Sequence, residues 1–131
     1  MIPTLAVGKD RAMKLGSKIL VVDDNEDFRE LLKDVLETKG FSIIEAGDGE
    51  EALEQYKKTD PAGAIVDLDM PKMNGIELSK ELKKINAKFP ILMVTAYASW
   101  YSPEEILATG IDAFLSKPVT MDKLVKVIEQ L

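Results

Sequence analysis

The residues of this chain best suited to chemistry stand at the ends of apolar runs. They are Asp23, Asp24, Asp67, Thr95 and Lys117. Clustered carboxylates repel one another, and a divalent cation that prefers oxygen ligands, Mg²⁺, removes that conflict. A lysine ammonium and a threonine hydroxyl beside such an ion form a site for a transferring phosphoryl group. Since the chain has no histidine and no cysteine, an aspartate is the nucleophile expected to accept that group.

The stretch Ala64–Gly75 carries the strongest of these signals. Its first three residues are apolar and predict a buried strand, whereas Pro71 and Gly75 prevent that strand from continuing. We therefore expect Asp67 where the strand ends and a loop begins.

Apolar strand runs alternate with amphipathic helices from Lys18 onward. The expected strands are Ile19–Val22, Ser42–Ala46, Ala64–Asp67, Ile91–Thr95 and Ala113–Leu115. The expected helices start at Asn25, Asp48, Asn74, Ser102 and Thr120. This order predicts an α/β fold, a doubly wound parallel sheet of five strands with helices on both faces. Ligands bind such sheets at the carboxyl ends of the strands, where all the candidate residues fall.

Helix signals in the sequence also predict caps and buried faces. Capping boxes are expected where a cap is followed three residues later by a glutamate, at Asp48, Asn74 and Ser102. The first helix is expected to end at Lys39 before Gly40. The buried faces are expected to include Phe28 and Leu31 in the first helix and Ile85 in the third.

Composition excludes several classes of protein. The net charge of −6 argues against a nucleic-acid surface, and no apolar run approaches the length of a membrane span. The missing histidine and cysteine argue against a zinc site, a Ser-His triad and disulfides. Residues 1–17 lack the alternating pattern, and their apolar part, Ile2–Val7, is too short for a signal peptide. We interpret them as an extension or a cloning remnant before a single domain, residues 18–131.

The motifs Val22-Asp23-Asp24, Asp67–Gly75, Thr95-Ala96 and Lys117-Pro118 occur in the order typical of one family. Together they resemble the response-regulator receiver domain, the phosphoacceptor module of two-component signalling. The resemblance covers Lys18–Leu131 and implies a flavodoxin-like sheet with strand order 2-1-3-4-5. It further implies a cytoplasmic, phosphorylation-dependent switch with Mg²⁺ as cofactor, and not a conventional turnover enzyme.

The resemblance assigns roles around the metal and the acceptor. It implies that Asp67 accepts the phosphoryl group and that Asp24 binds Mg²⁺ directly, with Asp23 beside it. The backbone carbonyl of Asp69 completes the protein ligands. Asp69 would also be an extra acid at the rim of the pocket, and Tyr97 is bulky. Both positions tune hydrolysis of the phosphoaspartate in the family.

Switching roles are implied for residues on the later strands. Thr95 would hydrogen-bond a phosphoryl oxygen beside the small Ala96, and Lys117 would pair with another phosphoryl oxygen. The Lys117-Pro118 bond resembles the family's cis peptide, and Phe114 occupies the position of its aromatic switch.

The resemblance also implies partners. The phosphoryl donor would be the phosphohistidine of a sensor histidine kinase or of a phosphotransfer protein. A downstream protein would bind the face made by the fourth helix, the fifth strand and the fifth helix. No direct nucleic-acid contact or membrane insertion is implied, and the chain would be a monomer or a phosphorylation-linked dimer.

Two other interpretations of the acidic motif are open. An apolar strand that ends in Asp67-Leu68-Asp69 resembles the nucleophile motif of haloacid-dehalogenase-type phosphatases. Asp67 would then be the nucleophile and Asp69 the general acid. Met70-Pro71, the place of the motif on the third strand and the early position of the acidic pair count against it. The remaining alternative is a receiver-like scaffold that binds partners without being phosphorylated.

Overall fold

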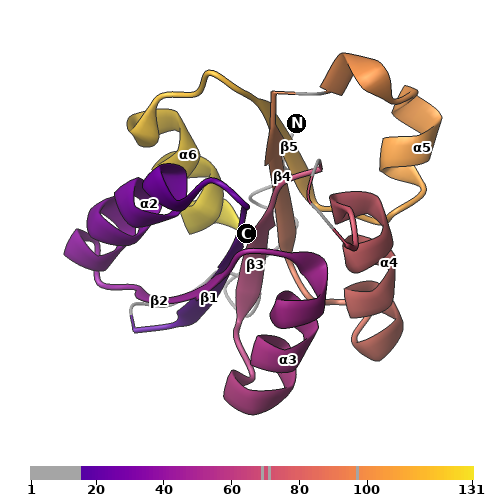
Figure 1. Ribbon diagram of the computed structural model, residues 1–131. Coiled ribbons are helices and arrows are strands. Elements are labelled where there is room, and N and C mark those ends of the chain that lie inside the picture. Colours follow the sequence, from indigo (N-terminus) through magenta and orange to yellow (C-terminus); the bar gives the residue numbers. More distant parts are fainter. Residues whose placement is uncertain (1–15, 69, 71, 97) are drawn as a thin grey trace.

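The computed structural model describes residues 16–68, 70, 72–96 and 98–131. Within them, five parallel strands form a sheet in the order β2-β1-β3-β4-β5 (Figure 1). The strands are β1 (Lys18–Val22), β2 (Ser42–Ala46), β3 (Gly63–Val66), β4 (Ile91–Thr95) and β5 (Ala113–Ser116). The expected doubly wound parallel sheet, with its strand order, is confirmed.

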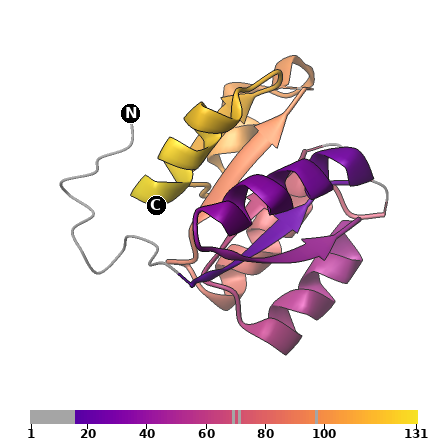
Figure 2. The same cartoon turned by 90° about the vertical axis from the view of Figure 1, so that its left-hand side faces the viewer.

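Helices cover both faces of the sheet. They are α2 (Glu26–Thr38), α3 (Gly49–Thr59), α4 (Gly75–Ile85), α5 (Pro103–Leu107) and α6 (Met121–Gln130), with a 3₁₀ turn, η2 (Ala98–Trp100), before α5. Helices α2 and α6 lie on one face, which Figure 2 views from the front, and α3, α4 and α5 lie on the other. No helix in the described part of the chain combines the length and hydropathy needed to cross a lipid bilayer.

Successive residues of the central strands belong to different hydrophobic cores. In β1, Ile19 and Val21 pack in the core under α2 and α6, whereas Leu20 and Val22 pack on the opposite face. All four side chains are at most 1% exposed. Because both faces are covered, Ile19–Val22 form a continuous apolar run, and the acidic pair follows where the strand ends.

Each helix begins at a residue whose side chain caps the first turn. These residues are Asn25, Asp48, Asn74, Ser102 and Thr120, as the sequence predicts. A reciprocal capping box forms between Ser102 and Glu105. At α3, the Glu51 carboxylate accepts a hydrogen bond of 2.6 Å from the N–H of Gly47. The expected capping box has the N–H of Asp48 as the donor to Glu51, whereas in the structure the donor is the N–H of Gly47, one residue earlier.

Removal of the Ser102 hydroxyl tests the contribution of this capping box. The Ser102 Oγ accepts a hydrogen bond of 3.1 Å from the N–H of Glu105. We expect Ser102→Ala to lower the free energy of unfolding by about 1 kcal/mol, because that N–H loses its partner. Urea denaturation measures the change, and Ser99→Ala, at an exposed serine just before it, is the matched control. Equal losses in the two variants would contradict a capping role.

Further sequence expectations differ from the structure. At Asn74 the side chain accepts from the N–H of Glu77, but the reciprocal bond of the expected capping box is not among the contacts of the described residues. The third strand ends at Val66, so Asp67 is the first residue of the loop. Leu31 is 47% exposed because it lies at the edge of the buried face of α2. Ile85 is 52% exposed, at the last residue of α4, where the helix ends. Both side chains were wrongly predicted to be core.

Candidate functional site

Asp67 lies at the centre of the carboxyl edge of the sheet. Its N–H donates a hydrogen bond of 2.9 Å to the Val22 carbonyl, which aligns it with the end of β1. The first residue of α4, Gly75, lies against the Asp67 carbonyl so closely that a Cβ there would collide with it. The Asp67 side chain is buried, and its Oδ1 atom has no hydrogen-bond partner among the described residues. The acceptor candidate therefore has a fixed main chain and an unsatisfied carboxylate oxygen.

Three aspartates from two strand ends converge here. One carboxylate oxygen each from Asp23, Asp24 and Asp67 lies within 4.8 Å of the others. Asp23 and Asp67 are 2% and 4% exposed, whereas Asp24 is open to solvent. The sequence places these residues at the carboxyl ends of strands, and in the structure β1 and β3 are neighbours that end at the same edge.

Burial and a neighbouring negative charge change the acidity of Asp67. Burial, and then repulsion from the Asp23 charge, raise the pKa of Asp67 from 3.8 to about 6. A hydrogen bond with the Thr95 side chain and the nearby Lys117 charge act in the opposite direction, but they do not cancel the increase. When Asp67 is ionised, the positive charge of Lys117 is not enough to balance the carboxylates of the pocket.

Lys117 reaches the cluster from the loop after β5. Its Nζ atom lies 2.8 Å from Asp23 Oδ2, and the two side chains are 20% and 3% exposed. The same atom lies 4.0 Å from the centroid of the Phe28 ring. The peptide bond between Lys117 and Pro118 is cis, as the family resemblance implies. In this structure the ammonium is therefore paired with Asp23.

Thr95 and Ala96, at the end of β4, are further site residues among those described. Thr95 is fully buried at the end of β4, and its carbonyl accepts a hydrogen bond of 2.8 Å from the N–H of Lys117. Ala96 is exposed and lines a groove that also includes Lys117. β4 and the loop after β5 thus hold the hydroxyl and the ammonium at one edge.

Phe114 lies apart from the carboxylates. It is in β5, opposite Met93 of β4, and packs partly buried against Leu68, Ile76 and Met93. Asp69 and Tyr97, which the sequence analysis singled out, lie outside the described residues.

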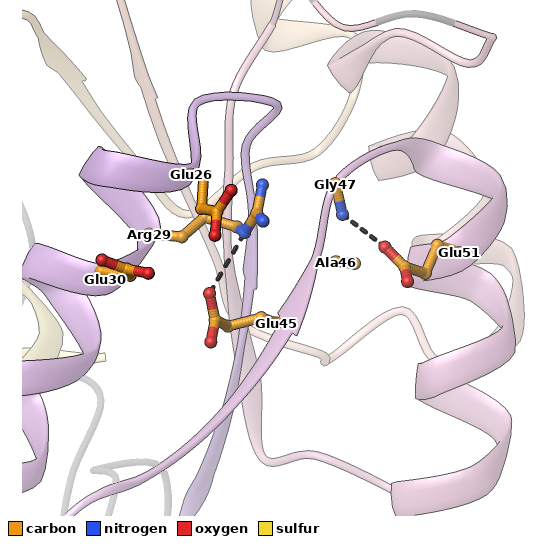
Figure 3. Close-up of a pocket in the computed structure, with 7 residues that line it drawn as sticks. All are labelled: Glu26, Arg29, Glu30, Glu45, Ala46, Gly47 and Glu51. Carbon is orange, nitrogen blue, oxygen red and sulfur yellow. Dashed lines mark hydrogen bonds and ion pairs between the residues drawn. The ribbon is translucent and has the colours of Figure 1, made fainter.

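Two further residues, in the first turn of α2, contact the site without having been predicted to do so from the sequence. Arg29 donates from Nη1 to the Asp23 carbonyl, at 2.6 Å, and from Nε to Glu45 Oε1, at 3.2 Å. Figure 3 shows this guanidinium between α2 and β2, in a polar pocket lined by Glu26, Arg29, Glu30, Glu45, Ala46, Gly47 and Glu51. Arg29 thereby fixes the main chain at Asp23. The second residue is Phe28, whose ring lies under the Lys117 ammonium. The sequence feature that could have identified both residues is their position shortly after the acidic pair Asp23-Asp24.

The donor set fits a hard divalent cation. Carboxylate oxygens are ligands that Mg²⁺ prefers, and a site that is partly open lets the ion keep several waters. Asp24 supplies the open side, while the buried Asp67 Oδ1 is an oxygen still without a partner among the described residues. Asp23, Asp24 and Asp67 are the residues that could hold such an ion.

Comparisons with known proteins match this chain to one family. A family model for the response regulator receiver domain matches residues 19–129. The alkaline phosphatase synthesis transcriptional regulatory protein PhoP of Bacillus subtilis is 40% identical over 104 residues, 79% of this chain but 43% of that protein. The chemotaxis protein CheY of Bacillus subtilis is 33% identical over 117 residues, 88% of this chain and 98% of that protein.

The solved structures agree as well. The structure of the chemotaxis protein CheY4 of Vibrio cholerae matches with a TM-score of 0.78 at 32% identity, covering 88% of this chain and 99% of that one. The fold and the family model lead to the same conclusion. The chain belongs to the response regulator receiver domain family, and is a phosphorylation-dependent signalling module.

Proposed function

We propose that Asp67 is the phosphoacceptor of this receiver domain. One Asp67 oxygen attacks the phosphorus of a partner phosphohistidine, the P–O bond forms as the P–N bond breaks, and the electron pair stays with the imidazole nitrogen. The observation that carries the proposal is the buried Asp67 Oδ1, which has no hydrogen-bond partner among the described residues. A carboxylate held that way is available as a nucleophile.

Asp23, Asp24 and Asp67 would hold Mg²⁺, with the Asp69 carbonyl assigned to it by family resemblance. When bound, the ion supplies positive charge that lowers repulsion among the carboxylates and toward the phosphoryl oxygens. The protein's own contribution is to orient these groups: Arg29 fixes the Asp23 main chain, and Gly75 lies against that of Asp67.

Lys117 and Thr95 would then bind the oxygens of the phosphoryl group on Asp67. The Lys117 ammonium exchanges Asp23 for a phosphoryl oxygen, and the Thr95 hydroxyl donates to another. Shifting a two-state equilibrium from mostly off to mostly on needs about 5.5 kcal/mol. One charge-assisted hydrogen bond supplies roughly 1.5–3 kcal/mol. Both contacts are therefore needed, and Phe114 in β5 is the proposed aromatic switch that follows them.

The output surface is the face of α5, β5 and α6. Its change of conformer population would alter the affinity for a downstream protein, in a monomer or a phosphorylation-linked dimer. The donor would be a sensor histidine kinase or a phosphotransfer protein in the cytoplasm. The domain would promote its own phosphorylation and dephosphorylation, with residues 18–131 as the functional unit and residues 1–17 as an extension.

Phosphorylation by a small donor tests the proposal. Incubation with acetyl phosphate and Mg²⁺ is expected to add the mass of one phosphoryl group, stable in acid and lost in base. Asp67→Asn should abolish this gain, whereas Asp48→Asn, which keeps a side chain able to cap α3, should retain it. Mass spectrometry of the intact protein and its peptides measures both.

Other outcomes would refute this assignment. A persistent gain in Asp67→Asn would move the acceptor elsewhere. Steady release of phosphate from many organic phosphates would indicate a phosphatase.

A further inference from the structure

The Lys117 ammonium has two neighbours that differ in kind. Asp23 Oδ2 lies 2.8 Å from Nζ, and the centroid of the Phe28 ring lies 4.0 Å from it. Phe28 belongs to the first helical turn of α2, whereas Lys117 directly follows β5. The aromatic ring and the carboxylate thus hold the ammonium from two different parts of the chain.

We propose that Phe28 is a positioning residue for the phosphoryl chemistry, acting through Lys117. Its ring keeps the ammonium in the pocket while the ionic partner of Lys117 changes from Asp23 to the phosphoryl group on Asp67. The inference rests on the proposed function of Asp67. It adds a residue that the acidic motif and the family resemblance did not bring out.

The ion pair with Asp23 cannot do this alone, because Asp23 is shared. Its Oδ1 accepts a hydrogen bond of 2.9 Å from the N–H of Asn25. Its carboxylate is also one of the three that meet within 4.8 Å. Any positive charge that neutralises this cluster weakens the attraction of Asp23 for Lys117. The contact with the ring does not depend on the charge of Asp23, so it persists when the ion pair weakens.

The contact also leaves the ammonium free to reorient. A ring face attracts a cation through its quadrupole and does not require one N–H to point along a fixed line. An ammonium has three donors, and one of them reaches Asp23 here. Lys117 can therefore turn toward a new oxygen without leaving the ring.

Packing fixes the ring itself. Phe28 packs, partly buried, against the core under α2 and α6. It also borders a groove of about 410 Å³ that is lined by Phe28, Leu31, Ala96, Lys117, Pro118, Val119 and Met121. The ring therefore contacts both this groove and the ammonium that pairs with Asp23. A smaller side chain at this position would admit water to the ammonium and weaken its hold.

The first test uses metal-free protein and needs no activity. The ring face should shift the Lys117 ε-methylene protons upfield of those of the other lysines in proton–carbon correlation spectra. Phe28→Leu should abolish this shift, Phe28→Tyr should preserve it, and Leu31→Ala, in the same groove, should leave it unchanged. A Lys117 signal that is unshifted in the unaltered protein overturns the proposal.

The second test measures the rate of phosphorylation by acetyl phosphate with Mg²⁺. Phe28→Leu should reduce the rate about threefold to tenfold, the range of a cation–π contact with a partly desolvated ammonium. Phe28→Tyr should restore the rate to within about twofold of the original, since a phenol ring keeps the contact. In a Lys117→Met background, Phe28→Leu should have no further effect. An equal reduction in both backgrounds would show that Phe28 acts only as core packing.

Failure of this inference is distinguishable from failure of the proposed function. If Asp67 is phosphorylated at the same rate in Phe28→Leu, the positioning role is wrong and the acceptor stands. If Asp67→Asn is still phosphorylated, the acceptor itself is wrong.

Discussion

Replacing Asp67 with asparagine should raise the free energy of unfolding by about 3 kcal/mol at pH 8 without divalent cations. The reason is the pKa of Asp67, raised from 3.8 to about 6 by burial and by the Asp23 charge. Because the folded state holds this proton more tightly than the unfolded chain, ionisation destabilises the fold. The penalty is absent below pH 3.8, grows between pH 3.8 and about 6 and is complete above that range.

Urea denaturation at several pH values between 4 and 8 checks this expectation. The advantage of Asp67→Asn should be small near pH 4 and largest above pH 6. The control is Asp48→Asn, because hydrogen bonding to the Glu51 N–H lowers the pKa of Asp48; its ionised form favours the fold, so this variant should show no gain. Added Mg²⁺ should stabilise the unaltered protein more than Asp67→Asn. An unaltered protein as stable as Asp67→Asn at pH 8 would contradict the raised pKa.

Gly75→Ala is expected to lower the free energy of unfolding by about 1–3 kcal/mol. A Cβ at residue 75 would collide with the Asp67 carbonyl and approach the Leu68 Cα to 2.8 Å. The N–H of Gly75 also donates a hydrogen bond of 2.8 Å to the Leu68 carbonyl. The loop would have to move, and the Asp67 carboxylate would move with it.

This change should therefore slow phosphorylation as well as destabilise the fold. Urea denaturation and the acetyl phosphate reaction measure the two effects. Gly47→Ala is the matched control, because a Cβ there would make only ordinary contacts of 3.5 and 3.7 Å with Arg29 and Glu51. Gly75→Ala with the stability and rate of Gly47→Ala would show that the close approach has no consequence.

The fold was predictable because its determinants are local. Buried parallel strands need apolar residues on both faces, and helices need caps, so a window of a few residues identifies each element. Ser102 and Glu105 form their box within one helical turn. Glu51 bonds to Gly47 instead of completing a box at Asp48, because a carboxylate in the first turn can reach either of two neighbouring N–H groups.

The edge of a buried face was less predictable than its centre. Leu31 and Ile85 have the spacing of core residues, yet both are about half exposed. Helical periodicity gives the direction in which a side chain points, but not how far the neighbouring layer extends. Leu31 instead lines the groove beside Lys117.

The sequence predicted the position of the site better than its pairings. Because every parallel strand ends at the same edge, the order of the motifs was enough to bring Asp23, Asp67 and Lys117 together. The Lys117–Asp23 ion pair and the contact with Phe28 depend on side-chain directions set by the packing of α2 against the sheet. Helical periodicity assigned Phe28 only to the core face, where its ring is indeed packed.

The main chain of Asp67 is held on both sides, by its hydrogen bond to Val22 and by its contact with Gly75. If Asp67 gains a phosphoryl group as proposed, its main chain has little room to move, and we expect the displacement to pass to the neighbouring strands. Thr95 borders the acceptor, and Ser116 pairs with Thr95 across the adjoining strands. The effect of phosphorylation would then pass from strand to strand, at right angles to the strands, and reach the β5 edge of the sheet. The main chain of Asp67 would stay in place.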